Sequence, residues 1–176
     1  MFKLFQSRKR KAEHEQLLVD MMRAAAEGEN IARFRSAASM IGAQTSGLEG
    51  SRFVGVVSGR LARRLIDEAS YFWEDKDAQF VAGLFAFVAC NHVSYKTGDP
   101  FEESTVIAIL EIVTPELERA ADLHSEVVKT YNGLGENQPK LMQAIGQTTA
   151  RWFSEPSDEN LRSLADLFEV CVKNLD

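Results

Sequence analysis

Apolar residues recur every three or four positions along almost the whole chain, which is the spacing that places them on one face of a helix. The breaks between these segments carry glycine, proline and small polar residues, which start and stop helices. The pattern therefore predicts an all-α fold. The expected helices lie at about 12–27, 31–43, 50–73, 78–94, 100–113, 115–131, 139–153 and 158–175.

The first two predicted helices are separated by a very short link. Leu17, Leu18, Met21 and Ala25 share one face of the first, and Gly28 stands where a left-handed C-terminal cap would end it. A link of this length favours an antiparallel helix pair.

The segment 52–58 is rich in β-favouring residues, and a strand is the competing interpretation there. The helical spacing continues past Leu61, so we expect a helix. Ser51, Gly55 and Gly59 fall four residues apart on one face of it, which would let another helix approach closely. That neighbour can belong to this domain or to a partner, and the internal contact is favoured.

The segment 78–94 is apolar nearly all round, from Phe80 through Phe85 to Cys90. A helix without a polar face is usually surrounded by other helices. We therefore predict a single globular bundle of about seven to eight helices around a buried central helix at about 78–94.

Several boundaries carry recognisable chemistry. Asp99 and Pro100 suit the N-cap and first position of a helix, and Thr114-Pro115 ends that helix and opens the next. Asn132 to Gly135 is predicted to be a turn, and Ser157 is predicted to cap the last helix.

Bulk properties narrow the class of protein. The chain has 176 residues, a net charge of −6 and two cysteines, Cys90 and Cys171, which are expected to be reduced core residues. The longest apolar run, 80–90, is about half the roughly 20 residues of a membrane-spanning helix. We expect a cytoplasmic protein without a secretory signal or a transmembrane segment.

The N-terminus has a charge opposite to that of the rest. Residues 1–11 carry +5, and residues 12–176, taken as the single α-helical domain, carry −11. This basic arm is expected to be frayed, and it could alternatively touch anionic lipid or nucleic acid. The acidic domain argues against nucleic acid. The membrane-contact candidates are Phe2, Lys3, Leu4, Phe5, Arg8, Lys9, Arg10 and Lys11.

No catalytic spacing stands out. His14, His92 and His124 lie outside any helical metal-ligand motif, so neither a metal nor a cofactor is expected. His92 ends the apolar central segment, and together with Tyr95 and Asp99 it could line a pocket of a ligand-binding protein or an enzyme.

An acidic stretch surrounds Trp73. We expect Trp73 to pack against the domain, while its acidic neighbours face solvent and cap helix starts. The same acidic residues could alternatively form a docking surface for a basic partner. With no catalytic constellation, the sequence favours a non-enzymatic protein-binding domain such as an adaptor, inhibitor, immunity or regulatory factor. The partner-interaction candidates are Asp67, Glu68, Trp73, Glu74, Asp75 and Asp77.

Overall fold

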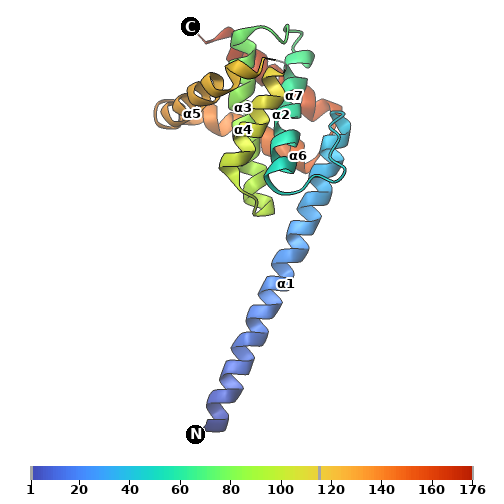
Figure 1. Cartoon of the computed structure of the whole chain (residues 1–176), viewed down its shortest axis with the longest axis vertical. Coiled ribbons are helices and arrows are strands. Elements are labelled where there is room, and N and C mark those ends of the chain that lie inside the picture. Colours follow the sequence, from blue (N-terminus) through green and yellow to red (C-terminus); the bar gives the residue numbers. More distant parts are fainter. Residues whose placement is uncertain (1, 115, 176) are drawn as a thin grey trace.

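The chain forms a helical bundle from which one long helix projects (Figure 1). The computed structural model describes residues 2–114 and 116–175, except the side chains of 2–15, 17, 18, 117 and 135–137. Within these residues there are seven α-helices and one short 3-10 helix, which confirms the all-α prediction. They are α1 (Phe2–Met40), α2 (Gly50–Glu68), α3 (Lys76–Thr97), α4 (Phe101–Val113), η1 (Leu117–Arg119), α5 (Ala120–Asn137), α6 (Pro139–Ser154) and α7 (Asp158–Lys173).

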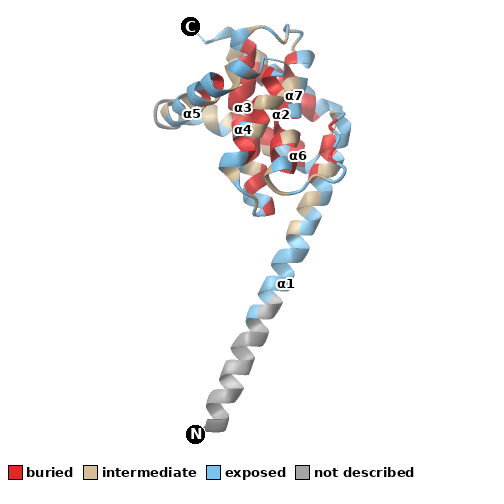
Figure 2. Cartoon of the chain, viewed as in Figure 1, coloured by how far each residue is buried: buried red, intermediate tan, exposed pale blue. Residues whose placement is uncertain are grey.

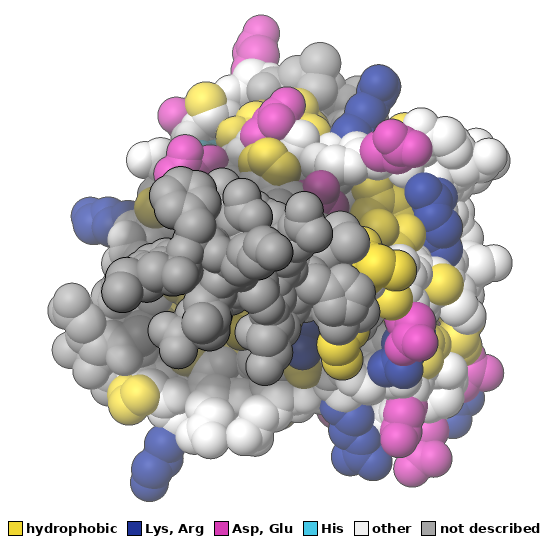
Figure 3. All heavy atoms as spheres, turned by 90° about the horizontal axis from the view of Figure 1, so that it is seen from below, with side chains coloured by type: hydrophobic (Ala, Val, Ile, Leu, Met, Phe, Trp, Pro, Cys, Tyr) yellow, Lys and Arg dark blue, Asp and Glu magenta, His cyan; other side chains and the backbone are white. Residues whose placement is uncertain are grey.

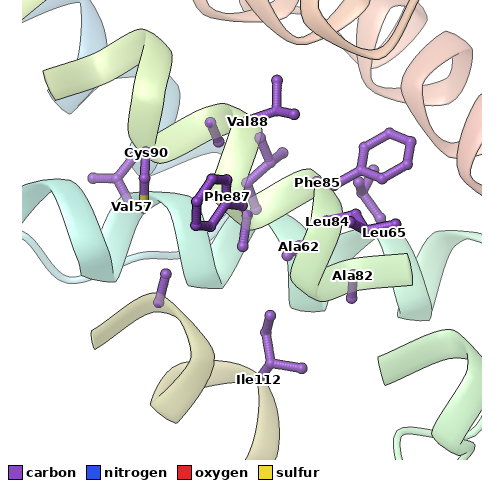
Figure 4. Close-up of a cluster of buried hydrophobic side chains, with 14 of the residues drawn as sticks. Val57, Ala62, Leu65, Ala82, Leu84, Phe85, Phe87, Val88, Cys90 and Ile112 are labelled. Carbon is purple, nitrogen blue, oxygen red and sulfur yellow. The ribbon is translucent and has the colours of Figure 1, made fainter. Parts of the chain in front are cut away.

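Helix α3 is the centre of the bundle, as its apolar sequence predicts. It contacts each of the other α-helices, and its buried residues run almost without interruption from Val81 to Cys90. Figure 4 shows Phe85, Phe87 and Val88 among side chains of α2 and α4. The helix starts where the Asp75 carboxylate accepts bonds from two backbone N–H groups. It ends at Gly98, whose φ of +75° gives the left-handed cap.

The length and mean hydropathy of α3 would also suit a membrane span. Its apolar window has a mean hydropathy of 1.2, and 78% of that window is buried inside the bundle. Core helices of bundles commonly share this composition. Burial by the neighbouring helices therefore accounts for the apolar residues of α3.

Helices α2 and α4 pack against each other at close range. The stretch 52–58 belongs to α2, so the helix prediction is confirmed and the strand alternative is wrong. A Cβ atom added to Gly55 would lie 2.5 Å from the Ile107 Cβ, and one added to Gly59 would lie 2.6 Å from the Ala108 carbonyl oxygen. The small-residue face of α2 therefore serves an internal contact.

Helix boundaries follow the predicted chemistry in part. Helix α4 ends at Val113, α6 begins with Pro139, and the Ser157 hydroxyl accepts a bond from the Asn160 N–H, all as expected. The turn predicted from Asn132 is wrong, because α5 continues to Asn137. Proline has no N–H and restricts the residue before it, so Pro139 rather than the glycines ends this helix.

The break predicted at Gly28 is also wrong. Helix α1 runs without interruption from Phe2 to Met40, and the left-handed glycine lies at Gly42, with φ +68°. A glycine inside a helix costs only about 1 kcal/mol relative to alanine, which its helix-forming neighbours outweigh. The antiparallel pair expected from 12–27 and 31–43 is therefore one continuous helix.

Candidate partner-binding site

The C-terminal part of α1 is anchored in the bundle. The Phe34 ring makes edge contacts with the rings of His92 and Phe153, at centroid distances of 6.0 and 5.2 Å. The Asn30 amide donates to the Lys96 carbonyl at 3.1 Å. Arg35 donates to two carbonyls of the following loop and lies over the Phe53 ring. These contacts hold α1 to the bundle from about Asn30 onward.

The part of α1 before Glu27 projects away from the bundle (Figure 1). Every residue between Val19 and Ala26 is exposed, as the blue part of α1 shows in Figure 2. This set includes three large apolar side chains: Val19 is 51% exposed, Met21 60% and Met22 74%. Such side chains are usually buried, so a run of them on one helix marks a candidate interaction surface.

The apolar residues of α1 change sides where the helix leaves the bundle. At 3.6 residues per turn, positions 16, 20, 23, 27 and 34 lie within about 60° of one another. This face carries buried Phe34 inside the bundle, but Gln16, Asp20, Arg23 and Glu27 along the projecting part. Met21, Met22 and Ala25 lie more than about 100° away from it. We call these three residues the α1 apolar face.

The α1 apolar face is therefore not a continuation of the surface that anchors α1. Helices in water gain most of their stability from packing an apolar face, rather than from their intrinsic propensity. Within the chain as described, no helix covers Met21 or Met22. Met21 and Met22 are therefore exposed apolar side chains on a part of α1 that the bundle leaves uncovered.

A second surface feature lies between α2 and α4. A groove of about 760 Å³ is lined by apolar side chains and by charged side chains of both signs. Arg60 and Glu111 form an ion pair across it at 2.6 Å, which neutralises part of that charge. Figure 3 likewise shows hydrophobic side chains among mixed charges on the face seen from below. The groove is lined by Gly42, Gln44, Leu48, Arg52, Val56, Arg60, Glu103, Ile107, Leu110 and Glu111.

The acidic candidates have separate roles. The Asp75 carboxylate caps α3, accepting from the N–H groups of Asp77 and Ala78 at 2.9 and 3.0 Å. Glu68 forms an ion pair with Arg64 on α2. The guanidinium of Arg63 lies 5.9 Å from the centre of the half-buried Trp73 ring.

The remaining acidic candidates, Asp67, Glu74 and Asp77, are exposed. Phe72, beside Trp73, is 82% exposed. Asp75 and Glu68 have partners within the bundle. That this stretch binds another protein stays a prediction.

The three pocket candidates contact different neighbours. The His92 ring is stacked on Phe153, and burial together with the nearby Lys96 charge lowers the pKa of the imidazole. Tyr95 is 82% exposed, with the Lys96 ammonium over its ring. Asp99 is half-buried beside Gly50. A ligand site built from these residues remains an expectation.

The membrane-contact candidates from Phe2 to Lys11 have backbone within α1, but their side chains lie outside the described residues. Among the residues that are described, no three His, Cys, Asp or Glu side chains come together as a metal-ion site. Both cysteines are free thiols, and burial raises the pKa of Cys90 to about 12. A thiol with this pKa is inert at neutral pH.

No protein-family model, curated protein or solved structure matches the chain. Its function is therefore inferred from the geometry of α1 and the bundle. The sequence pattern placed Met21 and Ala25 on one face of a helix expected to form an antiparallel pair, and it did not single out Met22. One sequence feature indicates this face: the positions on the same side of the helix as Phe34 are polar before the bundle begins. They are 16, 20, 23 and 27.

Proposed function

We propose that this chain is a non-enzymatic protein-binding helical domain, and that the projecting part of α1 is its binding element. The observation that carries the proposal is the exposure of Met21 and Met22 on a helix face that the bundle does not cover. Adaptors, inhibitors and regulatory factors commonly offer such a helix to a complementary groove or helix.

The residue types suit this role. Methionine is flexible and polarisable, so it adapts to irregular apolar surfaces. The neighbouring Ala24, Ala25 and Ala26 are small, which lets a partner approach the helix closely between the larger side chains. The bundle holds the C-terminal part of α1 through Phe34 and Arg35, so the binding face is presented on a firmly attached support.

Affinity capture with matched variants of the full chain tests this proposal. Met21→Glu/Met22→Glu places two charges on the α1 apolar face, whereas Gln16→Glu/Arg23→Gln makes the same change in net charge on the opposite face. Both pairs of positions lie in the projecting part of α1, so the bundle should keep its stability.

We expect a stoichiometric partner to be captured by the wild type and the control variant, and lost with Met21→Glu/Met22→Glu. A partner retained equally by all three proteins would show that binding occurs elsewhere. Capture of no partner, including no second copy of the chain, would contradict the proposed function.

A further inference from the structure

We propose that the loop between α2 and α3 is a second protein-binding surface, where the Phe72 ring enters an apolar pocket of a partner protein whose rim is basic. This inference goes beyond the proposed function, because it uses a different end of the bundle. The loop precedes the first turn of α3, whereas His92 and Lys96 in the last turns of α3 hold α1. Figure 1 shows the loop at the end of the bundle away from the projecting part of α1.

The loop holds Phe72 outward between two anchored aromatic side chains. Phe72 is 82% exposed, whereas its neighbours Tyr71 and Trp73 are half-buried. The Tyr71 ring meets the Phe168 ring of α7 edge-on, with 6.2 Å between the ring centres. The Trp73 ring lies beside the Arg63 guanidinium of α2. An aromatic ring on an anchored loop binds without first ordering the chain, which lowers the entropic cost of association.

Backbone hydrogen bonds fix the same loop. The Trp73 carbonyl accepts from the amide of buried Gln79 at 2.9 Å, and the Asp75 N–H donates to the Phe72 carbonyl at 3.0 Å. The Tyr71 N–H donates to a carbonyl in the last turn of α2 at 3.1 Å. The chain is thus tied to the bundle on both sides of Phe72, and the exposure of its ring belongs to a well-connected loop.

Phe72 differs from an isolated apolar residue on a surface. Single exposed apolar side chains are common, but here Tyr71 and Trp73 adjoin the exposed ring, so three consecutive aromatic residues form one end of the bundle. Aromatic side chains in small pockets supply much of the binding energy of protein interfaces. The tip therefore has the residue types of an interface anchor.

The surroundings of Phe72 are more acidic than the bundle requires. Residues 67–77 contain five acidic residues and one basic residue, a net charge of −4. Asp67 and Glu74 are exposed, and neither carboxylate forms an ion pair within the part of the chain that the structure describes. Asp67 also lies in the last turn of α2, where a negative charge opposes the helix dipole. Local helix stability therefore does not account for this charge.

The charge beside the ring selects the class of partner. Anionic lipid and nucleic acid are both repelled by a surface with this net charge. A protein with an apolar pocket surrounded by lysine and arginine gains from burial of the Phe72 ring and from charge attraction at the rim. Charge complementarity thus favours a basic protein surface as the occupant.

Photo-crosslinking from position 72 of the full chain tests this surface. A photoreactive phenylalanine derivative at position 72 keeps an aromatic ring there, and the same derivative at position 95 is the control. Tyr95 is also 82% exposed, but it lies near the other end of α3. In the native cell we expect a covalent protein adduct from position 72 in clear excess over position 95. Mass spectrometry should assign the cross-linked peptides to a partner surface rich in lysine and arginine.

Charge neutralisation tests the basic rim. Asp67→Asn/Glu74→Gln removes two charges beside the ring and leaves the Asp75 cap and the Glu68 ion pair in place. We expect the yield of the adduct from position 72 to fall by about three- to tenfold. The melting temperature of this variant should stay at or above that of the wild type, so that a lower yield is not a failure to fold.

The control for charge is Glu49→Gln/Glu103→Gln. These exposed residues lie at the N-terminal ends of α2 and α4, away from the loop. The change in net charge is the same as in the test variant. We expect the adduct yield from position 72 to be unchanged.

The outcomes separate this inference from the proposed function. The adduct from position 72 should persist in Met21→Glu/Met22→Glu, and its loss there would show that the loop is not a separate surface. No protein adduct from position 72, equal yields from positions 72 and 95, or cross-linked peptides from an acidic surface would each overturn the inference. A yield that is the same in both charge variants would overturn it as well. None of these results bears on binding through Met21 and Met22.

Discussion

The imidazole ring of His92 stacks on the phenyl ring of Phe153, with ring centres 5.8 Å apart and 13° between the planes. Phe34 meets both rings edge-on, so this cluster joins α1, α3 and α6. The projecting helix is thus attached to the bundle through an ionisable residue. Burial, and then the charge of Lys96, lowers the pKa of His92, so the neutral imidazole is the form that packs.

This pKa shift predicts how stability depends on pH. The unfolded chain protonates His92 near the ordinary pKa of about 6.5, whereas the folded chain does so only at lower pH. The contribution of His92 is therefore complete above about pH 6.5 and is lost as pH falls through the lowered pKa of the folded state. Urea unfolding at a series of pH values should show this decline.

The control for this experiment is His92→Phe, which keeps an aromatic ring and cannot be protonated. The difference in unfolding free energy between this variant and the wild type should grow as the pH falls. If the two proteins show the same pH dependence, His92 does not titrate in this way.

The close contact between α2 and α4 predicts a strong effect of a single methyl group. Gly59→Ala would place its Cβ 2.6 Å from the backbone oxygen of Ala108, so the helices must separate. We expect the unfolding free energy to fall by about 1–3 kcal/mol. Gly146→Ala in α6 is the control, since its Cβ meets nothing within 4 Å and should stabilise the helix by about 0.5–1 kcal/mol. Equal effects at the two positions would argue against the tight α2–α4 packing.

Substitutions at Asp75 and Glu74 should differ in their effect on stability, because only the Asp75 carboxylate caps α3. Asp75→Ala deletes the acceptor of two backbone N–H bonds, and we expect a loss of about 1 kcal/mol in unfolding free energy. Glu74→Ala, next to it and exposed, should change stability little. Urea denaturation measures both, and unchanged stability in Asp75→Ala would show that the cap contributes nothing.

The two cysteines should differ in reactivity. Burial raises the pKa of Cys90 to about 12 and also raises that of the half-buried Cys171. We expect an aromatic disulfide reagent at mildly alkaline pH to modify Cys171 slowly, and Cys90 only after unfolding. In Cys171→Ser the folded protein should not react. If Cys90 in the folded Cys171→Ser variant reacted rapidly, releasing one equivalent of the aromatic thiolate, the centre of the bundle would open readily.

Local chemistry in the sequence was sufficient to locate much of the bundle. Pro139 and Ser157 start helices because a missing N–H and a capping hydroxyl act within a few residues. The uninterrupted apolar character of α3 also indicated its central position, because a helix that is apolar on every face must be covered on every face.

Other features depended on tertiary context. Gly28 and Gly42 are the same residue type, but of the two only Gly42 adopts the left-handed conformation that allows the chain to turn. The direction of Met21 relative to Phe34 could be calculated from helical periodicity only once the two were known to share one continuous helix. The predicted break at Gly28 hid that relationship, and with it the exposed face.

Photo-crosslinking in the native cell is the most direct test of binding through the α1 apolar face. A photoreactive amino acid at position 22 lies on this face, and one at position 20 lies on the opposite side of the same helix. We predict a covalent protein adduct from position 22 in clear excess over position 20. No adduct, or equal yields from the two positions, would contradict the account.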